Sequence, residues 1–169
     1  QLNDAVSPLF LQELASCHFI QNRQNVIMIG NPGRGKTHLA IALGLKACTQ
    51  GYNVLFKNAA TLSTELCEAK DNYHLGKLER TLAKADLLIL DEWLIRPLSP
   101  QEAYDLLEIV EARCKRSMLF CTQYQPEGWY TRIDPNPESD SPVSEAIMDR
   151  IIHNSYEIMV EGRISMRER

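Results

Sequence analysis

Short, mainly apolar runs alternate with longer segments of helical periodicity along this chain of 169 residues. Apolar runs of this length are typical of buried strands, and we expect strands at residues 26–29, 53–56, 87–90, 117–121 and 156–160. The longer segments repeat their apolar residues every three or four positions, which predicts helices at residues 36–49, 61–69, 75–85, 99–114 and 143–152. Strands that alternate with helices predict a parallel sheet flanked by helices.

The borders of these segments carry start and stop signals. Ser99 offers a hydroxyl as a helix N-cap, and Pro100 and Glu102 complete a capping pattern. Four prolines between residues 124 and 142 predict a stretch without regular structure. At this length, and without an internal repeat, we expect residues 1–169 to form one domain with little or no separate lid domain.

A glycine-rich loop joins the first predicted strand to the first predicted helix. It reads Gly30-Asn31-Pro32-Gly33-Arg34-Gly35-Lys36-Thr37 and fits the phosphate-binding pattern G-x-x-x-x-G-K-[ST]. Backbone N–H groups of such a loop surround phosphates, Lys36 reaches the terminal phosphates, and Thr37 offers a hydroxyl to magnesium. The alternative is a chance glycine turn, which the position between strand and helix argues against. We expect ATP and Mg²⁺ to bind this loop and the adjacent His38.

Two carboxylates, Asp91 and Glu92, follow the third predicted strand. Open α/β sheets bind ligands at the carboxyl ends of their strands, so this is a Walker B pattern. Asp91 would hold the magnesium and Glu92 would polarise the attacking water, although a strand ending in solvated acids is the alternative. Together with the glycine loop, this pattern predicts a three-layer P-loop NTPase.

A glutamine, Gln123, follows the fourth predicted strand. It would orient the attacking water if this strand neighbours the strand that ends at Asp91. The alternative is an ordinary solvated loop glutamine.

Composition restricts the compartment and the partners. The five cysteines form no C-x-x-C pair and are expected to be reduced thiols, which fits a cytoplasmic protein. No run approaches the ~20 apolar residues of a membrane span, so no membrane contact is expected. A net charge of -4 argues against a wholly basic, nucleic-acid-coating surface but allows a local basic patch. The four histidines lack metal-ligand spacing, and Trp93 and Trp129 are expected to be packing residues.

Five blocks of sequence occur in the order of one known ATPase family: residues 30–37, 85–93, 122–123, 146–154 and 165–167. From about Phe10 to its end the chain resembles the IstB transposition helper ATPases. These are relatives of the DnaC-type helicase loaders within the AAA+ class. The resemblance implies a AAA+ ATPase that assembles head-to-tail as a homo-oligomer on DNA and serves a transposase.

The resemblance also implies roles for individual residues. Gln123 matches sensor 1, Arg150 matches the arginine finger that acts on a neighbour's ATP, and Arg167 matches the sensor 2 arginine. The basic side chains of residues 70–84 occupy a position that faces the DNA channel in helicase loaders: Lys70, Lys77, Arg80 and Lys84. Many family members have two aspartates where this chain has Asp91-Glu92, and that pair is the usual one of AAA+ enzymes. The amino-terminal region that grips DNA or a partner is expected to be missing from this chain.

Three other functions remain as alternatives. A DnaC-like loader would use the same site but serve a replicative helicase. A small-molecule P-loop kinase also has a glycine loop, but it generally lacks the carboxylate pair and carries an arginine-rich lid that this sequence does not show. A nucleotide-gated adaptor without hydrolysis is disfavoured by Glu92 and Gln123.

Overall fold

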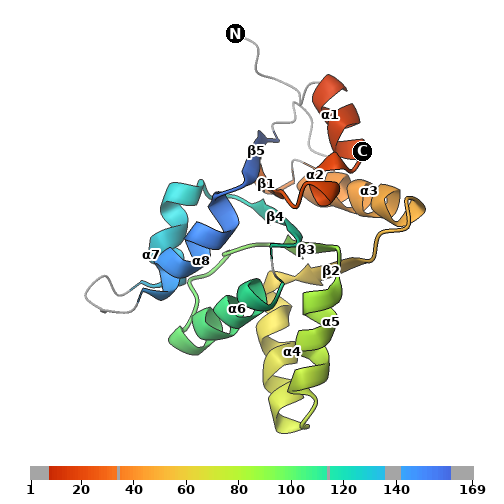
Figure 1. Cartoon of the computed structure of the whole chain (residues 1–169). Coiled ribbons are helices and arrows are strands. Elements are labelled where there is room, and N and C mark those ends of the chain that lie inside the picture. Colours follow the sequence, from red (N-terminus) through yellow and green to blue (C-terminus); the bar gives the residue numbers. More distant parts are fainter. Residues whose placement is uncertain (1–7, 34, 114, 136–141, 161–169) are drawn as a thin grey trace.

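The computed structural model describes residues 8–33, 35–113, 115–135 and 142–160, which form a five-stranded sheet and its helices (Figure 1). The strands are β1 (Asn25–Ile29), β2 (Val54–Asn58), β3 (Leu87–Asp91), β4 (Ser117–Thr122) and β5 (Ser155–Met159). Their order is β2-β3-β4-β1-β5, and every neighbouring pair is parallel. The predicted α/β fold with a parallel sheet is confirmed, and each strand lies within two residues of its expected position.

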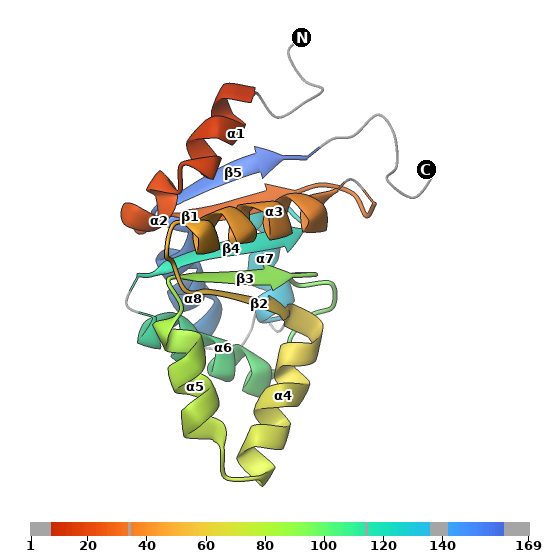
Figure 2. The ribbon, with the colours of Figure 1, turned by 90° about the vertical axis from the view of Figure 1, so that its right-hand side faces the viewer.

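Helices cover both faces of this sheet (Figure 2). The helices on one face are α1 (Pro8–Ala15), α2 (His18–Gln21) and α3 (Lys36–Thr49). The helices toward the other face are α4 (Ala59–Asp71), α5 (Leu75–Lys84), α6 (Pro100–Ala112), α7 (Trp129–Ile133) and α8 (Val143–Ile152). Alternate strand residues point into the two layers, as strand geometry requires: Val26 and Met28 pack toward α3, whereas Ile27 and Ile29 pack with the larger layer.

Two short helices, α1 and α2, precede β1 and were not expected from the sequence pattern. Their side chains Leu14, Phe19 and Ile20 are buried in the same apolar cluster as α3, so tertiary packing stabilises them. None of the described helices is long and apolar enough to cross a membrane.

The proline-rich stretch after β4 is partly helical, so the prediction of an irregular loop at residues 124–142 is wrong for its described part. A 3₁₀ helix spans Pro126–Gly128 and leads directly into α7. Its proline is tolerated because the first helical position needs no N–H donor. Trp129 is fully buried, donates its Nε1–H to the Tyr124 carbonyl over 2.9 Å, and packs against Trp93. Both tryptophans are packing residues, as predicted.

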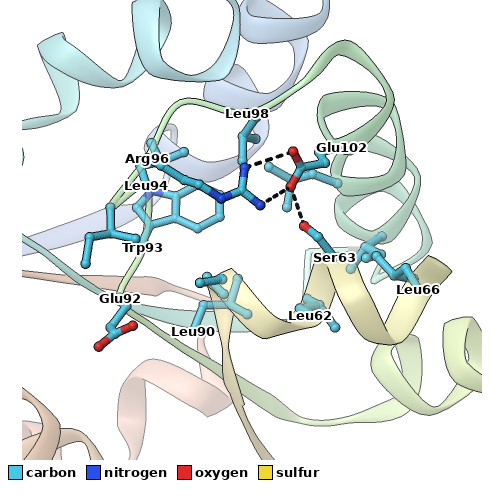
Figure 3. Close-up of a pocket in the computed structure, with 15 residues that line it drawn as sticks. Leu62, Ser63, Leu66, Leu90, Glu92, Trp93, Leu94, Arg96, Leu98 and Glu102 are labelled. Carbon is cyan, nitrogen blue, oxygen red and sulfur yellow. Dashed lines mark hydrogen bonds and ion pairs between the residues drawn. The ribbon is translucent and has the colours of Figure 1, made fainter. Parts of the chain in front are cut away.

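The loop between β3 and α6 closes an apolar hollow of about 50 Å³ between α4 and α6 (Figure 3). At its rim the Glu102 carboxylate accepts hydrogen bonds from Arg96 at 3.0 and 2.8 Å and from the Ser63 hydroxyl at 2.6 Å. The capping box predicted at Ser99 is formed, so this carboxylate also caps α6. These bonds, that of Arg96 above all, lower the pKa of Glu102 to about 2. The ionised carboxylate therefore connects α4, α6 and the loop.

Two arginines, Arg113 and Arg116, join the end of α5 to the start of β4, at the amino ends of the strands. The buried Arg113 guanidinium donates to the carbonyls of Leu82 in α5 and Ser117 at the start of β4. Burial lowers the pKa of Arg113 to about 10, which leaves it charged at neutral pH. The exposed Arg116 donates to the Ala83 carbonyl. The positive charge at these carbonyls complements the partial negative charge at the carboxyl end of α5. Both arginines lie far from the carboxyl ends of the strands.

Candidate nucleotide-binding site

The carboxyl ends of β1, β3 and β4 surround a cleft of about 370 Å³. Its lining residues come from the three segments that follow these strands, within residues 32–38, 91–95 and 121–124. The three segments meet because the strands are parallel and β4 lies between β1 and β3. The structure thereby brings together the glycine loop, the carboxylate pair and the glutamine that the sequence places far apart.

Two positions of the loop favour glycine, one because of its backbone conformation and one because there is no room for a side chain. Gly35 has a φ of 86°, a left-handed conformation that glycine adopts without strain, and it precedes the first turn of α3. A Cβ atom at Gly30 would lie 2.4 Å from the carbonyl oxygen of Val160, which follows β5. The loop is therefore shaped by the close passage of the chain after β5. It delivers the amino end of α3, with its free N–H groups, to the cleft.

Lys36, the first residue of α3, folds its side chain back over the glycine loop. Its ammonium donates to the carbonyl oxygens of Gly30 and Asn31, the latter at 3.0 Å. Burial lowers the pKa of Lys36, and Cys121 and Asp91 oppose that shift. Burial raises the pKa of the Cys121 thiol to about 12, so this thiol is neutral at pH 7 and Asp91 is the charge that favours the ammonium. The Lys36 ammonium is thus held beside the loop that would receive the phosphates.

A hydroxyl and a carboxylate face each other across the cleft floor. The Thr37 Oγ1 atom donates to Asp91 Oδ2 over 3.0 Å, and Asp91 Oδ1 accepts from the Glu92 backbone N–H over 2.9 Å. Hard oxygen atoms of this kind are the ligands that Mg²⁺ prefers, and Mg²⁺ usually takes only one or two protein ligands besides phosphate and water. Among the described residues no cluster of three or more His, Cys, Asp or Glu side chains forms a metal cage. The pair Thr37 and Asp91 fits a magnesium site of the phosphate-bridged kind.

Glu92 lies directly after β3 in a left-handed conformation with a φ of 54°. The Asn58 side-chain amide donates to Glu92 Oε2 over 3.0 Å. The Asn58 carbonyl oxygen of the same side chain caps α4 by accepting from the backbone N–H groups of Ala60 and Thr61. Sequence analysis did not identify Asn58, although an asparagine before a helix is a typical N-cap. This one side chain fixes both the start of α4 and the orientation of the Glu92 carboxylate.

Gln123 is exposed, lines the cleft and follows β4. The strand adjacency on which its predicted role depended is confirmed, because β3 pairs with β4. Its neighbour Thr122 is buried and connects the two strand ends. The Thr122 hydroxyl donates to the Trp93 carbonyl and accepts from the Tyr124 N–H, each over 3.1 Å.

The other predicted site residues have different placements. His38 is exposed in the first turn of α3 and lines the cleft. Arg34 and Arg167 lie outside the described residues. Arg150 is on α8, where its guanidinium forms an ion pair of 3.1 Å with Glu111 of α6 and donates to its own helix. Arg150 does not line the cleft formed by the described residues.

The basic residues proposed to contact DNA lie on the hairpin of α4 and α5, which projects beyond the sheet (Figure 2). Lys70 of α4 forms an ion pair with Asp105, with its Nζ 2.9 Å from both carboxylate oxygens. Lys77, Arg80 and Lys84 are exposed on α5. The exposed positive charge of the hairpin therefore lies mainly on α5.

Comparison with known proteins gives consistent matches. Residues 2–169 match the family described as IstB-like ATP binding protein. The chain is 37% identical over 144 residues to an insertion sequence ATP-binding protein of Sinorhizobium fredii, a match that covers 85% of this chain and 57% of the relative. It is 34% identical over 152 residues to the insertion sequence IS21 ATP-binding protein of Pseudomonas aeruginosa. That match covers 90% of this chain and 56% of the relative. The chain thus spans less than two thirds of the length of these relatives.

Solved structures share the fold at low sequence identity. The DnaC helicase loader matches with a TM-score of 0.73 at 20% identity over 94% of both chains. AMPPCP-bound DnaA from Aquifex aeolicus matches with a TM-score of 0.71 at 18% identity over 94% of this chain and 46% of that one. These likenesses show the P-loop AAA+ fold, and the family match shows the lineage. The chain belongs to the family of IstB-like ATP-binding proteins.

Proposed function

We propose that this chain binds Mg-ATP in the cleft between β1, β3 and β4 and hydrolyses it. One observation carries the proposal: the loop lysine, the Thr37–Asp91 pair, Glu92 and Gln123 all border the same cleft. The family name and the nucleotide bound to the DnaA relative support ATP as the ligand.

Each residue has a defined task in this chemistry. The loop N–H groups and Lys36 hold the phosphates, and Thr37 and Asp91 hold magnesium, which would supply positive charge to the phosphate oxygens. Glu92 accepts a proton from the attacking water as the water oxygen bonds to the γ-phosphorus, while the bond between the γ-phosphorus and the β–γ bridging oxygen breaks and ADP leaves with that electron pair. Gln123 orients the same water from the neighbouring strand end. Arg167 would contact the nucleotide from the end of the chain.

We propose further that the complete protein assembles head-to-tail on DNA and acts as the ATPase helper of an insertion-sequence transposase. Relatives at 34% and 37% identity are named as insertion sequence ATP-binding proteins, which supports this setting. The alternative is a loader of a replicative helicase, supported by the likeness to the DnaC loader over 94% of that chain. Both clients would use the same ATP site, so the client is decided by binding experiments on the complete protein.

Arg150 is proposed to act on the ATP of the adjacent subunit. In the single chain the Arg150 side chain is 44% exposed and that of its partner Glu111 is 48% exposed. Exposed ion pairs contribute little to stability, so the guanidinium can exchange Glu111 for the γ-phosphate of a neighbour at small cost. A cation there would neutralise charge that develops as the phosphate is transferred.

Glu92→Gln is expected to keep ATP binding and lose hydrolysis, because a general base acts mainly on the transition state. Turnover should fall about 100-fold or more while the dissociation constant of Mg-ATP stays within about twofold. Glu108→Gln, an exposed change on α6, is the matched control and should hydrolyse ATP normally. Parental turnover of Glu92→Gln would show that the base lies elsewhere.

Arg150→Ala and Lys36→Ala are each expected to be nearly inactive, with turnover reduced on the order of 10³-fold for the arginine. A mixture of the two should regain turnover, because some interfaces then combine an intact ATP cleft with an intact arginine. Steady-state ATPase measurements over a range of protein concentrations test this. Activity that is independent of both concentration and Arg150 would remove the arginine-finger assignment and leave the ATP site in place.

DNA binding by the complete protein should require ATP-driven assembly and weaken steeply with salt, because phosphate contacts release counterions. Replacing Lys77, Arg80 and Lys84 together by alanine should weaken retention of DNA and lower the salt slope by about 0.9 for each DNA phosphate that these side chains neutralise. A control that replaces Arg23, Lys46 and Lys115, all exposed, removes the same charge elsewhere. Failure of the parent to retain DNA at low salt with ATP would refute DNA binding, and equally weakened retention in both variants would refute the α5 site.

A further inference from the structure

The segment after β3 that carries Glu92 has an unusual backbone. Glu92 and Leu94 both have positive φ values, 54° and 57°, although neither is glycine. Non-glycine residues rarely adopt this conformation, and each instance persists only where the surrounding structure holds it. The position of the Glu92 carboxylate therefore depends on whatever fixes residues 92–95.

Arg132 of α7 contacts this backbone directly. Its Nε–H donates to the Leu94 carbonyl over 2.7 Å and its Nη2–H donates to the Ile95 carbonyl over 3.0 Å. Hydrogen bonds from a charged donor are stronger than neutral ones. The Arg132 carbonyl also accepts from the Leu98 N–H over 2.8 Å, so α7 holds both the middle and the end of the loop.

The same guanidinium reaches the segment that carries Gln123. It stacks on the Tyr124 ring, with 3.9 Å between the guanidinium carbon and the ring centroid. Deeper in the fold, the Thr122 hydroxyl joins the Trp93 carbonyl to the Tyr124 N–H. The Trp93 N–H also donates to the Cys121 carbonyl over 2.8 Å. The segment after Glu92 and the segment around Gln123 are thus joined by this backbone bond, by Thr122 and, through side-chain contacts alone, by Arg132.

We propose that Arg132 is a positioning residue for ATP hydrolysis: it fixes the spacing between Glu92 and Gln123, the two side chains that act on the attacking water. The inference rests on the proposed ATPase function. Arg132 is not among the described residues that line the nucleotide cleft, so it acts through the two segments and not on the nucleotide. Its loss lets the Glu92 segment relax toward ordinary backbone angles and move the carboxylate away from the water.

Arg132→Met in the complete protein removes the guanidinium and keeps most of the side-chain stem. We expect kcat to fall about tenfold or more, because small misplacements of a catalytic group are costly, while affinity for a non-hydrolysable ATP analogue changes less than about threefold. Arg116→Met is the matched control. Arg116 also donates to a backbone carbonyl, but it lies at the amino ends of the strands, away from the cleft. A purely structural role would lower thermal stability and affect kcat and binding alike.

Combining Arg132→Met with Glu92→Gln separates the positioning role from the general-base role. If Arg132 acts through Glu92, the double variant should be no slower than Glu92→Gln alone, because the effects of coupled residues are not additive. A further fall in kcat as large as the one that Arg132→Met causes in the parent would mean that the two residues act independently, and it would overturn the positioning role. Parental turnover of Glu92→Gln would overturn the proposed ATPase mechanism itself. An inactive Glu92→Gln beside an Arg132→Met with parental kcat would overturn only the positioning role.

Arg132→Lys decides the question if Arg132→Met does not fold. Lysine keeps the charge and the stem but cannot donate to both carbonyls in the planar geometry of arginine. We expect kcat to fall severalfold relative to the parent, about threefold or more, at unchanged analogue affinity and thermal stability. A lysine variant with the parental kcat would contradict the proposal.

Discussion

The parallel pairing of β4 between β1 and β3 is the constraint on which the site depends. It sends the carboxyl ends of three strands to one edge and so makes the glycine loop, the carboxylate pair and Gln123 neighbours. The Thr37 hydroxyl at 3.0 Å from Asp91 then follows from the two strand ends lying on either side of β4. A different strand order would leave the same motifs apart.

The helical layer on the far face also contributes to the geometry of the cleft. Asn58 joins the Glu92 carboxylate to the start of α4, and Arg132 joins α7 to the carbonyls of Leu94 and Ile95, which follow Glu92. Glu102, ionised because its pKa lies at about 2, ties α4 and α6 to the end of the same loop. Movements of these helices would therefore change the position of the Glu92 carboxylate. This gives a physical route by which the proposed assembly or partner binding would alter the proposed hydrolysis.

Local sequence was sufficient to predict the parts of the site that depend on the backbone path of one segment. The glycine loop and Asp91-Glu92 belong to motifs whose spacing is set by a strand, a turn and a helix, so their placement could be predicted. α7 could not, because Trp129 and its buried ring contacts outweigh the prolines near it, and those contacts join distant residues. The roles of Asn58 and Arg132 likewise depend on partners more than thirty residues away.

The central claim, that the cleft is a Mg-ATP site built around the glycine loop, is tested most directly by calorimetric titration with a non-hydrolysable ATP analogue and magnesium. The parent and Lys46→Ala, an exposed change on the same helix, should bind equally. Lys36→Ala should lose affinity about tenfold or more, since in the proposed site the partly buried Lys36 ammonium contacts the phosphates. Equal affinity of Lys36→Ala and the parent would contradict the account.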